Sequence, residues 1–244
     1  MNLTIDIGNT RIKIGVFDSK KLLEVVAFDK SAFENEVKGI FNRYPTIHKV
    51  IFSSVAESAV EYEYAFGQDV QIFHLNKELA LNFSSRYDLR TLGSDRKALI
   101  AAAVINYPSE NVLIIDLGSC VTYDLVDCAG MHHGGGISPG WQMRIKAMYE
   151  FTDRLPKLSA FDPEVYNEAV TGTTTSDSMY NSTFFGLIAE IDERIEYYKS
   201  EFPDLTVILT GGDAPSFSVR LKRRIFAHSN FLLEGLNGLL EHNL

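Results

Sequence analysis

Asp6-Ile-Gly-Asn-Thr10 and Asp116-Leu-Gly-Ser-Cys120 repeat one pattern, 110 positions apart in a chain of 244 residues, and together they decide the fold. In each, an aspartate ends an apolar run, and a glycine-containing turn leads into a second strand-like stretch. The carboxylate can reach a hydrated cation, and the backbone N–H groups of the turn can face an anion. One such segment would mean little, because Asp and Gly are common turn residues. Two of them, each near the start of a chain half, predict a duplicated fold that holds a phosphate chain.

Strand-like and helix-like segments follow each other in the same way in both halves. We expect strands at 2–7, 12–17, 22–28, 50–55, 70–74, 112–117, 120–127 and 205–210, and helices at 31–44, 57–66, 96–107, 141–151, 178–200 and from 231 onward. The Gly-rich segment 132–136 is expected to form a turn. Strands first and crossover helices after, done twice, predict an α/β fold with halves at 1–110 and 111–244, each a mixed sheet flanked by helices.

The composition is that of an ordinary globular protein with an acidic charge balance. The net charge of −9 and the pI near 5.2 argue against broad binding to nucleic acid or to anionic membrane. The longest apolar run, 98–105, is too short to span a bilayer, and the N-terminus lacks the pattern of a secretory signal. Cys120 and Cys128 have no disulfide or metal spacing, so we interpret them as reduced thiols. We expect a cytoplasmic protein that binds neither membrane nor nucleic acid.

The first turn carries more than its aspartate and glycine. The hydroxyl of Thr10 can bind a phosphate oxygen, and Lys13 can supply a point charge for phosphate. On an extended strand Arg11 and Lys13 share a face, because side chains alternate. The alternative is an ordinary hairpin with a basic exposed face. The presence of the second turn favours the phosphate site.

The segment Gly93-Ser-Asp-Arg96 opens the Ala-rich helix and has two interpretations. In the first, Ser94 caps the helix and Asp95 lies in its first turn, where the helix dipole favours a negative charge. That leaves Arg96 unexplained, since a cation is unfavourable there without an anionic partner. In the second, the carboxylate orients an acceptor hydroxyl and takes its proton, while the guanidinium stabilises transferring or carboxylate oxygens. The residues alone leave both interpretations open.

Two further segments carry weaker signals. Thr210-Gly-Gly-Asp213 follows a buried strand, where small residues would let a base or ribose approach the backbone, but an ordinary turn is equally consistent. The adjacent His132 and His133 lack the spacing of a metal site, and we interpret them as turn residues.

At this point an ordered set of motifs resembles a known family. They are Asp-x-Gly-Asn-Thr-x-x-Lys at 6–13, Gly-x-Asp-Arg at 93–96, Asp-x-Gly-Ser at 116–119, Gly-Gly-Ile-Ser-Pro-Gly at 135–140, Leu-Pro at 155–156, Gly-x-x-Thr at 172–175 and Thr-Gly-Gly-Asp at 210–213. In this order the chain resembles type III pantothenate kinases, members of the actin-like and sugar-kinase ATPase superfamily. The resemblance runs from Asp6 nearly to the C-terminus.

The resemblance implies a fold, an activity and a set of partners. The fold would be two ribonuclease H-like halves, as in actin-like ATPases. The activity would be ATP-dependent phosphorylation of pantothenate at its primary hydroxyl, giving 4'-phosphopantothenate in the first step of coenzyme A biosynthesis. It further implies Mg2+, a monovalent cation (K+ or NH4+), and a homodimer with pantothenate near the subunit interface.

The resemblance also implies roles for individual residues. ATP would be bound by Asp6, Ile7, Gly8, Asn9, Thr10, Arg11, Ile12, Lys13 and Ser119, and pantothenate by Tyr87, Gly93, Ser94, Asp95, Arg96 and Thr175. Asp95 would be the proton acceptor, Asp116 would hold the monovalent cation, and Asp6 would hold magnesium. The chain departs from the family pattern at 119–120, where Ser and Cys replace Thr and Ala, and at Ser182, which replaces a Gly. The stretch from Tyr87 to Asp95 is one residue shorter than expected.

Two classes of alternative function stay open at this point. One is a kinase for another small hydroxylated metabolite, or a phosphatase of the same superfamily. The other is a non-catalytic regulatory protein that keeps the fold. Such a protein would be expected to lose Asp6, Asp95 or Arg96, and this chain retains all three.

Overall fold

The computed structural model describes residues 1–8, 11–54, 57–75, 79–158 and 170–244. The chain forms two compact units. The first comprises Met1–Ser109, Val126–Gly134 and Asn230–Leu244, and the second comprises Glu110–Leu125 and Gly135–Ser229. The division of the chain into two duplicated halves, 1–110 and 111–244, stays a prediction. The first compact unit includes two segments from the second half of the chain, Val126–Gly134 and Asn230–Leu244.

The first sheet has the strand order β3-β2-β1-β4-β5. Its strands are β1 (Asn2–Ile7), β2 (Arg11–Asp18), β3 (Lys21–Asp29), β4 (Lys49–Ser54) and β5 (Gln71–His74). Strand β1 pairs antiparallel with β2 and parallel with β4, and β4 pairs parallel with β5. Strands β2 and β3 also pair antiparallel, and three consecutive strands followed by strands that alternate with helices are the order that the sequence predicts for this half.

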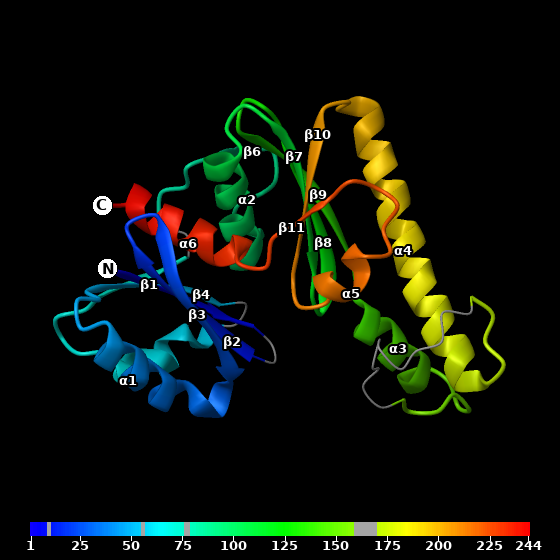
Figure 1. Ribbon diagram of the computed structural model, residues 1–244, viewed down its shortest axis with the longest axis horizontal. Helices are drawn as coiled ribbons and strands as arrows, with labels where there is room; N and C mark the ends of the chain where they lie inside the picture. Colours follow the sequence, from blue (N-terminus) through cyan, green and yellow to red (C-terminus); the bar gives the residue numbers. More distant parts are fainter. Residues whose placement is uncertain (9–10, 55–56, 76–78, 159–169) are drawn as a thin grey trace. The chain divides into compact units, whose positions relative to one another are not determined.

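Strand β1 divides its side chains between two layers. Leu3, Ile5 and Ile7 pack in an apolar core with helix α1 (Phe33–Arg43). Because side chains alternate along a strand, Asn2, Thr4 and Asp6 face the other layer. That layer contains α2 (Ser94–Asn106) and α6 (Phe231–His242), which lie side by side in Figure 1. The polar residues of β1 therefore face α2, whose first turn carries the Gly-x-Asp-Arg motif.

The second sheet has the order β11-β10-β7-β8-β9-β6. Its strands are β7 (Asn111–Leu117), β8 (Cys120–Val126), β9 (Met131–Pro139), β10 (Leu205–Thr210) and the two-residue strands β6 (Ser84–Ser85) and β11 (Phe226–Ala227). Strand β10 pairs parallel with both β7 and β11. The run β9-β8-β7-β10-β11 thus repeats the order β3-β2-β1-β4-β5. The predicted duplication of a ribonuclease H-like α/β half is confirmed.

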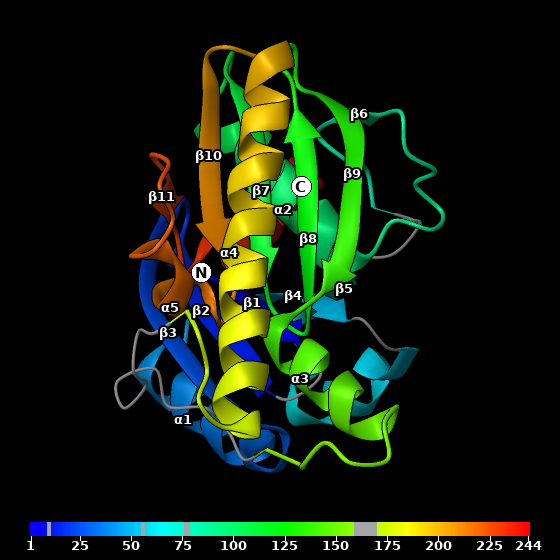
Figure 2. The ribbon, with the colours of Figure 1, turned by 90° about the vertical axis from the view of Figure 1, so that its right-hand side faces the viewer.

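Helix α4 (Thr175–Glu201) covers one face of the second sheet, and Figure 2 shows it running along β10, β7 and β8. Its apolar face packs with α3 (Trp141–Glu150) in the second core. The ring of Phe184 lies 5.3 Å from Trp141 and 4.7 Å from Phe217 of the short helix α5 (Ala214–Ser218). The helix begins three residues before the predicted position, because Thr174 accepts a capping hydrogen bond from Asp177 N at 3.1 Å.

One sequence prediction of secondary structure is wrong. The helix expected at 57–66 is present as the 3-10 helix η2 (Glu57–Ala65), but the turn expected at 132–136 is part of strand β9. The run of glycines suggests a turn, but in the structure it allows the backbone of β9 to lie close to that of β8. A Cβ on Gly135 would lie 1.6 Å from the carbonyl oxygen of Tyr123 in β8, so only glycine fits there. Among the residues that the structure describes, no helix has the length and apolar character needed to cross a bilayer.

Candidate active site

The site in the first unit begins with a row of side chains across three strands. The register pairs Asp6 of β1 with Lys13 of β2 and with Ser53 of β4. Residues directly opposite each other in neighbouring strands project from the same face. Lys13, Asp6 and Ser53 therefore form a row beneath the N-terminus of α2, at the carboxyl end of β1.

Two serines join this row to α2. Ser94 Oγ donates a hydrogen bond to Ser54 O at 2.8 Å and lies 3.3 Å from Ser53 Oγ. The expectation that Ser94 caps the helix is wrong: Gly93 is the N-cap residue, and Ser94 is the first helical residue. Because the hydroxyl of Ser94 contacts the end of β4, the first turn of α2 is fixed against the strand that neighbours Asp6.

The electrostatics of Asp6 depend on this arrangement. Burial, and in addition the negative charge of Asp95, raise the pKa of Asp6 from 3.8 to about 7. A hydrogen bond from Ser53 and the positive charge of Lys13 act in the opposite direction. The first turn and the Gly-x-Asp-Arg motif, 89 positions apart in sequence, thus contribute two mutually repelling carboxylates to one site.

Gly93 leaves room for the Asp95 carboxylate. A Cβ on Gly93 would lie 2.4 Å from Asp95 Oδ1, which is far inside van der Waals contact. The same oxygen accepts a hydrogen bond from Arg96 N at 2.7 Å. The backbone of the motif therefore orients the carboxylate, and the absence of a side chain at 93 is required for that orientation.

Arg96 is buried, with 4% of its surface exposed, and its guanidinium carbon lies 4.9 Å from the centre of the Tyr87 ring. A cation over an aromatic face is stabilised by the ring quadrupole. The stacking holds the planar guanidinium in a defined orientation, which suits recognition of a carboxylate or phosphate. It also places Tyr87 beside the motif despite the shorter connection between them.

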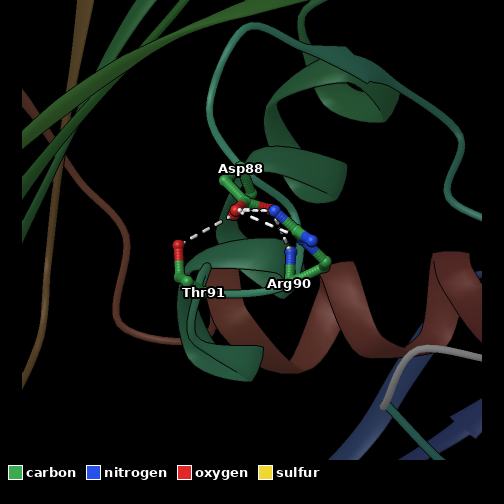
Figure 3. A network of polar contacts seen from close by, with 3 residues as sticks. All are labelled: Asp88, Arg90 and Thr91. Atoms are coloured by element: carbon green, nitrogen blue, oxygen red, sulfur yellow. Dashed lines mark hydrogen bonds and ion pairs between the residues drawn. The ribbon is translucent and has the colours of Figure 1, made fainter.

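A compact turn connects Tyr87 to Gly93. Figure 3 shows Asp88 at its centre: its Oδ1 accepts hydrogen bonds from Arg90 N at 3.0 Å and from Arg90 Nε at 2.9 Å. Its backbone carbonyl accepts hydrogen bonds from Thr91 Oγ1 and Thr91 N, both at 3.0 Å. An aspartate that folds the next residues around itself is an Asx turn. The connection is therefore ordered by its own residues.

The remaining predicted ATP residues of the first turn differ in their contacts. Ile7 and Ile12 are buried in the core with α1, so only their backbone is available to a ligand. Gly8 N donates to Arg11 O at 3.0 Å, while the Arg11 side chain is exposed and lies 3.7 Å from Asp29. The predicted contacts of Asn9 and Thr10 lie outside the described residues.

The second turn belongs to the second unit and is more compact. Only residues 118 and 119 separate β7 from β8, whereas 8–10 separate β1 from β2. The loop after β10 folds against this turn, since Asp213 N donates to Leu117 O at 3.0 Å. Gly211 has a φ of +96°, and a Cβ there would lie 2.4 Å from Asp116 Oδ1. The Thr-Gly-Gly-Asp segment therefore borders the Asp116 carboxylate.

Thr175, the remaining predicted substrate residue, also belongs to the second unit. It is the exposed first residue of the 27-residue helix α4. Its hydroxyl, at the N-terminus of the helix, is a donor suited to an anion or a hydroxylated ligand.

The comparisons with known proteins agree with these motifs. Residues 2–197 match the family described as type III pantothenate kinase. A type III pantothenate kinase from Christiangramia forsetii is 43% identical over 244 residues, covering 100% of this chain and 99% of that protein. Another from Flavobacterium psychrophilum is 39% identical over 243 residues, covering 99% of each chain.

The chain belongs to the type III pantothenate kinase family. Solved structures with much lower sequence identity share its fold. A Campylobacter jejuni protein named as a Baf family transcriptional activator has a TM-score of 0.64 at 21% identity, covering 99% of this chain and 98% of that one. A ROK family glucokinase from Streptomyces griseus, solved with glucose and AMPPNP, has a TM-score of 0.52 at 10% identity, with coverages of 99% and 98%. At these identities the likeness concerns the fold alone.

The Asp6 carboxylate fits a divalent cation that is bound together with a nucleotide. Within the described part of the chain, no group of three or more His, Cys, Asp or Glu side chains is arranged to hold a metal. Mg2+ at kinase sites is commonly held by one or two carboxylates together with substrate phosphates. The Asp6 carboxylate, whose ionisation is disfavoured by its surroundings, fits that arrangement, since a bound cation would favour the ionised form.

Ser53 and His132 are the residues near this site that the motifs do not indicate. Ser53 follows an apolar run in β4, and a polar residue at the carboxyl end of a strand parallel to β1 is the signal that could have indicated it. The sequence suggests a turn residue at His132, but the side chain is fully buried in β9 and its ring lies 6.2 Å from that of Tyr87. Its proximity to Tyr87 could not be inferred, because the short pairing of β6 with β9 has no sequence signature.

Proposed function

We propose that this protein transfers the γ-phosphoryl group of ATP to the primary hydroxyl of pantothenate, giving 4'-phosphopantothenate in the first step of coenzyme A biosynthesis. Membership of the type III pantothenate kinase family supports the choice of substrate. The observation that carries the proposal is the convergence of Asp6 and Asp95 in one site. One belongs to a phosphate-type turn and the other to a motif suited to an acceptor hydroxyl.

Asp95 is proposed as the proton acceptor. Its carboxylate is oriented by Arg96 N and by the space left at Gly93, so it can accept a hydrogen bond from the pantothenate hydroxyl. In phosphoryl transfer such a carboxylate orients the nucleophile and takes its proton late in the reaction. A hydroxyl held in line with the phosphoryl group loses little entropy in reaching the transition state.

Arg96 and Tyr87 are proposed to bind the acceptor. Pantothenate carries a carboxylate, and a stacked guanidinium is a preferred partner for that group. Burial of Arg96 strengthens such a pair, because competing water is excluded. Gly93 and Ser94 are proposed as further pantothenate contacts, and the contact of Thr175, which belongs to the second unit, stays a prediction from the resemblance.

ATP is proposed to bind along the first turn, residues 6–13, and the contact of Ser119, which belongs to the second unit, stays a prediction from the resemblance. Lys13 lies in the same row as Asp6 and can neutralise phosphate charge, while the turn supplies backbone N–H groups. Mg2+ bound with ATP would supply neutralisation of charge on the phosphate oxygens, and Asp6 is the residue proposed to hold it. Asp116 is proposed to hold a monovalent cation, K+ or NH4+. A cytoplasmic homodimer is proposed for the protein as a whole.

A coupled assay of ADP release tests this function. Purified protein is supplied with ATP and Mg2+, with pantothenate, glucose, glycerol or no acceptor, and with or without K+. We expect ADP release that depends on pantothenate and increases with K+. Release that is equal with every acceptor, or that requires a sugar, would assign the chain to another reaction on the same fold.

A further inference from the structure

His132 is fully buried in β9 and is placed against the segment that leads to Tyr87. Its Nδ1 lies 2.7 Å from Ser85 Oγ, and its backbone carbonyl accepts a hydrogen bond from Arg86 N at 2.9 Å. The sheet register also pairs Ser85 with His132. Side chain and backbone of one histidine thus attach the two-residue strand β6 to β9.

The same serine reaches Tyr87. Ser85 Oγ accepts a hydrogen bond from Tyr87 N at 3.0 Å, so its hydroxyl proton remains available for His132 Nδ1. The Tyr87 ring lies 6.2 Å from the imidazole with an interplanar angle of 36°, and its face lies against the Arg96 guanidinium. The imidazole of His132 therefore lies beside the ring of Tyr87, and that ring in turn lies against the guanidinium of Arg96 at the proposed acceptor site.

We propose that His132 is a positioning residue for Tyr87 and Arg96, and thereby sets the affinity for the acceptor substrate. The proposal rests on the proposed function, in which Arg96 binds the pantothenate carboxylate. Without the imidazole, the hydroxyl proton of Ser85 loses its acceptor and the Tyr87 ring loses packing on one side. The guanidinium then occupies a wider range of orientations, and part of the binding energy is used to order it.

The neighbouring histidine is a natural control. His133 points to the opposite face of β9, and its Nε2 lies 2.6 Å from Asp127 Oδ2. It is a partly buried histidine in the same strand, hydrogen-bonded as His132 is, but its bond to Asp127 lies on the opposite face of the strand. A loss caused merely by disturbing β9 would appear in both variants.

The test compares H132L, H132N, S85A, the double variant S85A/H132L and the control H133Q. Steady-state kinetics give KM for pantothenate, KM for ATP and kcat, and calorimetry gives the Kd for pantothenate without nucleotide. We expect H132L to raise KM and Kd for pantothenate about tenfold, the ratio expected for loss of one buried hydrogen bond. Changes in kcat and in KM for ATP should stay within about twofold. S85A should also raise KM and Kd for pantothenate. In the double variant the increase should be smaller than the product of the two single increases, because both substitutions remove the same hydrogen bond.

The conservative variant H132N keeps a hydrogen-bonding group near the position of Nδ1 and should recover most of the affinity, while H133Q should leave it unchanged. The role of His132 is overturned if H132L and S85A bind pantothenate as tightly as the unchanged protein. It is also overturned if KM for ATP rises in parallel, or if H133Q has the same effect. If H132L fails to fold, the affinities of S85A and H132N for pantothenate test the role of His132. Absence of pantothenate binding and turnover in the unchanged protein would instead overturn the proposed function.

Discussion

The carboxylate of Asp95, in the first turn of α2, lies close enough to Asp6, at the end of β1, to disfavour its ionisation. Burial is the larger cause, and the two effects together raise the pKa of Asp6 to about 7. The pair joins a turn suited to phosphates with a motif suited to an acceptor hydroxyl. Two neighbouring ionised carboxylates repel each other, and a bound cation relieves this repulsion. The arrangement therefore favours binding of a cation together with the substrate.

Replacement of Asp6 by Asn should stabilise the protein in the absence of metal and nucleotide. A carboxyl with a raised folded-state pKa binds protons more tightly when folded. Stability is therefore lost as the pH rises from about 4 to about 7. The Asn variant has no such loss, so its gain in unfolding free energy over the unchanged protein should be roughly 4 kcal/mol at pH 8 and less than half of that at pH 5. Urea unfolding at both pH values measures this.

The exposed Asp18, on the same sheet, supplies the control for that experiment. Because it is a substitution at an exposed position, Asp18→Asn should change the free energy of unfolding by less than about 0.5 kcal/mol. An Asp6→Asn variant that is destabilised at pH 8 would contradict the electrostatic account of the site. The same variant should lose kinase activity, so stability and activity are expected to change in opposite directions.

Replacement of Asp95 by Asn should abolish most turnover and leave the fold intact. The amide still fits beside Arg96 N but cannot take a proton, and loss of a general base costs roughly a hundredfold or more in rate. Pantothenate-dependent ADP release measures kcat, and nucleotide binding by calorimetry should persist. Turnover at the unchanged rate in folded Asp95→Asn protein would remove Asp95 from the proposed mechanism.

Replacement of Gly93 by Ala should displace the Asp95 carboxylate, because the added methyl group would lie 2.4 Å from Oδ1. A misplacement of about 1 Å at a reacting group can cost roughly a hundredfold in rate. We expect a loss of that size in kcat. The thermal stability should change little, because the Asp95 side chain can move away from the added methyl group without a shift of the backbone. Gly67→Ala is the matched control, because no atom lies within 4 Å of a Cβ there. Equal activity of the two variants would contradict the prediction.

Replacement of Gly211 by Ala should affect both stability and activation by K+. The φ of +96° is strained for alanine, and the methyl group would lie 2.3 Å from Leu117 O and 2.4 Å from Asp116 Oδ1. We expect a loss of roughly 1–3 kcal/mol in unfolding free energy. Titration of activity with KCl should show weaker activation.

Gly212→Ala provides the comparison for this variant. No atom lies within 4 Å of a Cβ at Gly212, although it is the next residue in the same loop. It should retain normal stability and normal KCl dependence. A Gly211→Ala protein with an unchanged KCl profile would argue against a cation at Asp116.

Much of the fold could be predicted from sequence because its signals are local. Apolar runs ending in Asp6 and Asp116 predicted the strands, and the repetition of that pattern predicted the duplicated order of the two sheets. Strand β9 could not be predicted in this way. Its glycines resemble a turn until the backbone of Tyr123 is placed against Gly135, which is a contact between strands.

The sequence by itself determined the residue types that the chemistry needs: Asp6 with Lys13, Asp95 with Arg96, and Asp116 in a second turn. Their chemistry follows from the side chains and from short spacings along the chain. Only the tertiary structure decided that Ser53 and Ser94 join β4 to α2, that Asp6 and Asp95 share one site, and that His132 lies against Tyr87. These relationships depend on strand register and helix packing. They bring distant residues together through the burial of apolar surface, which the local sequence around each residue does not specify.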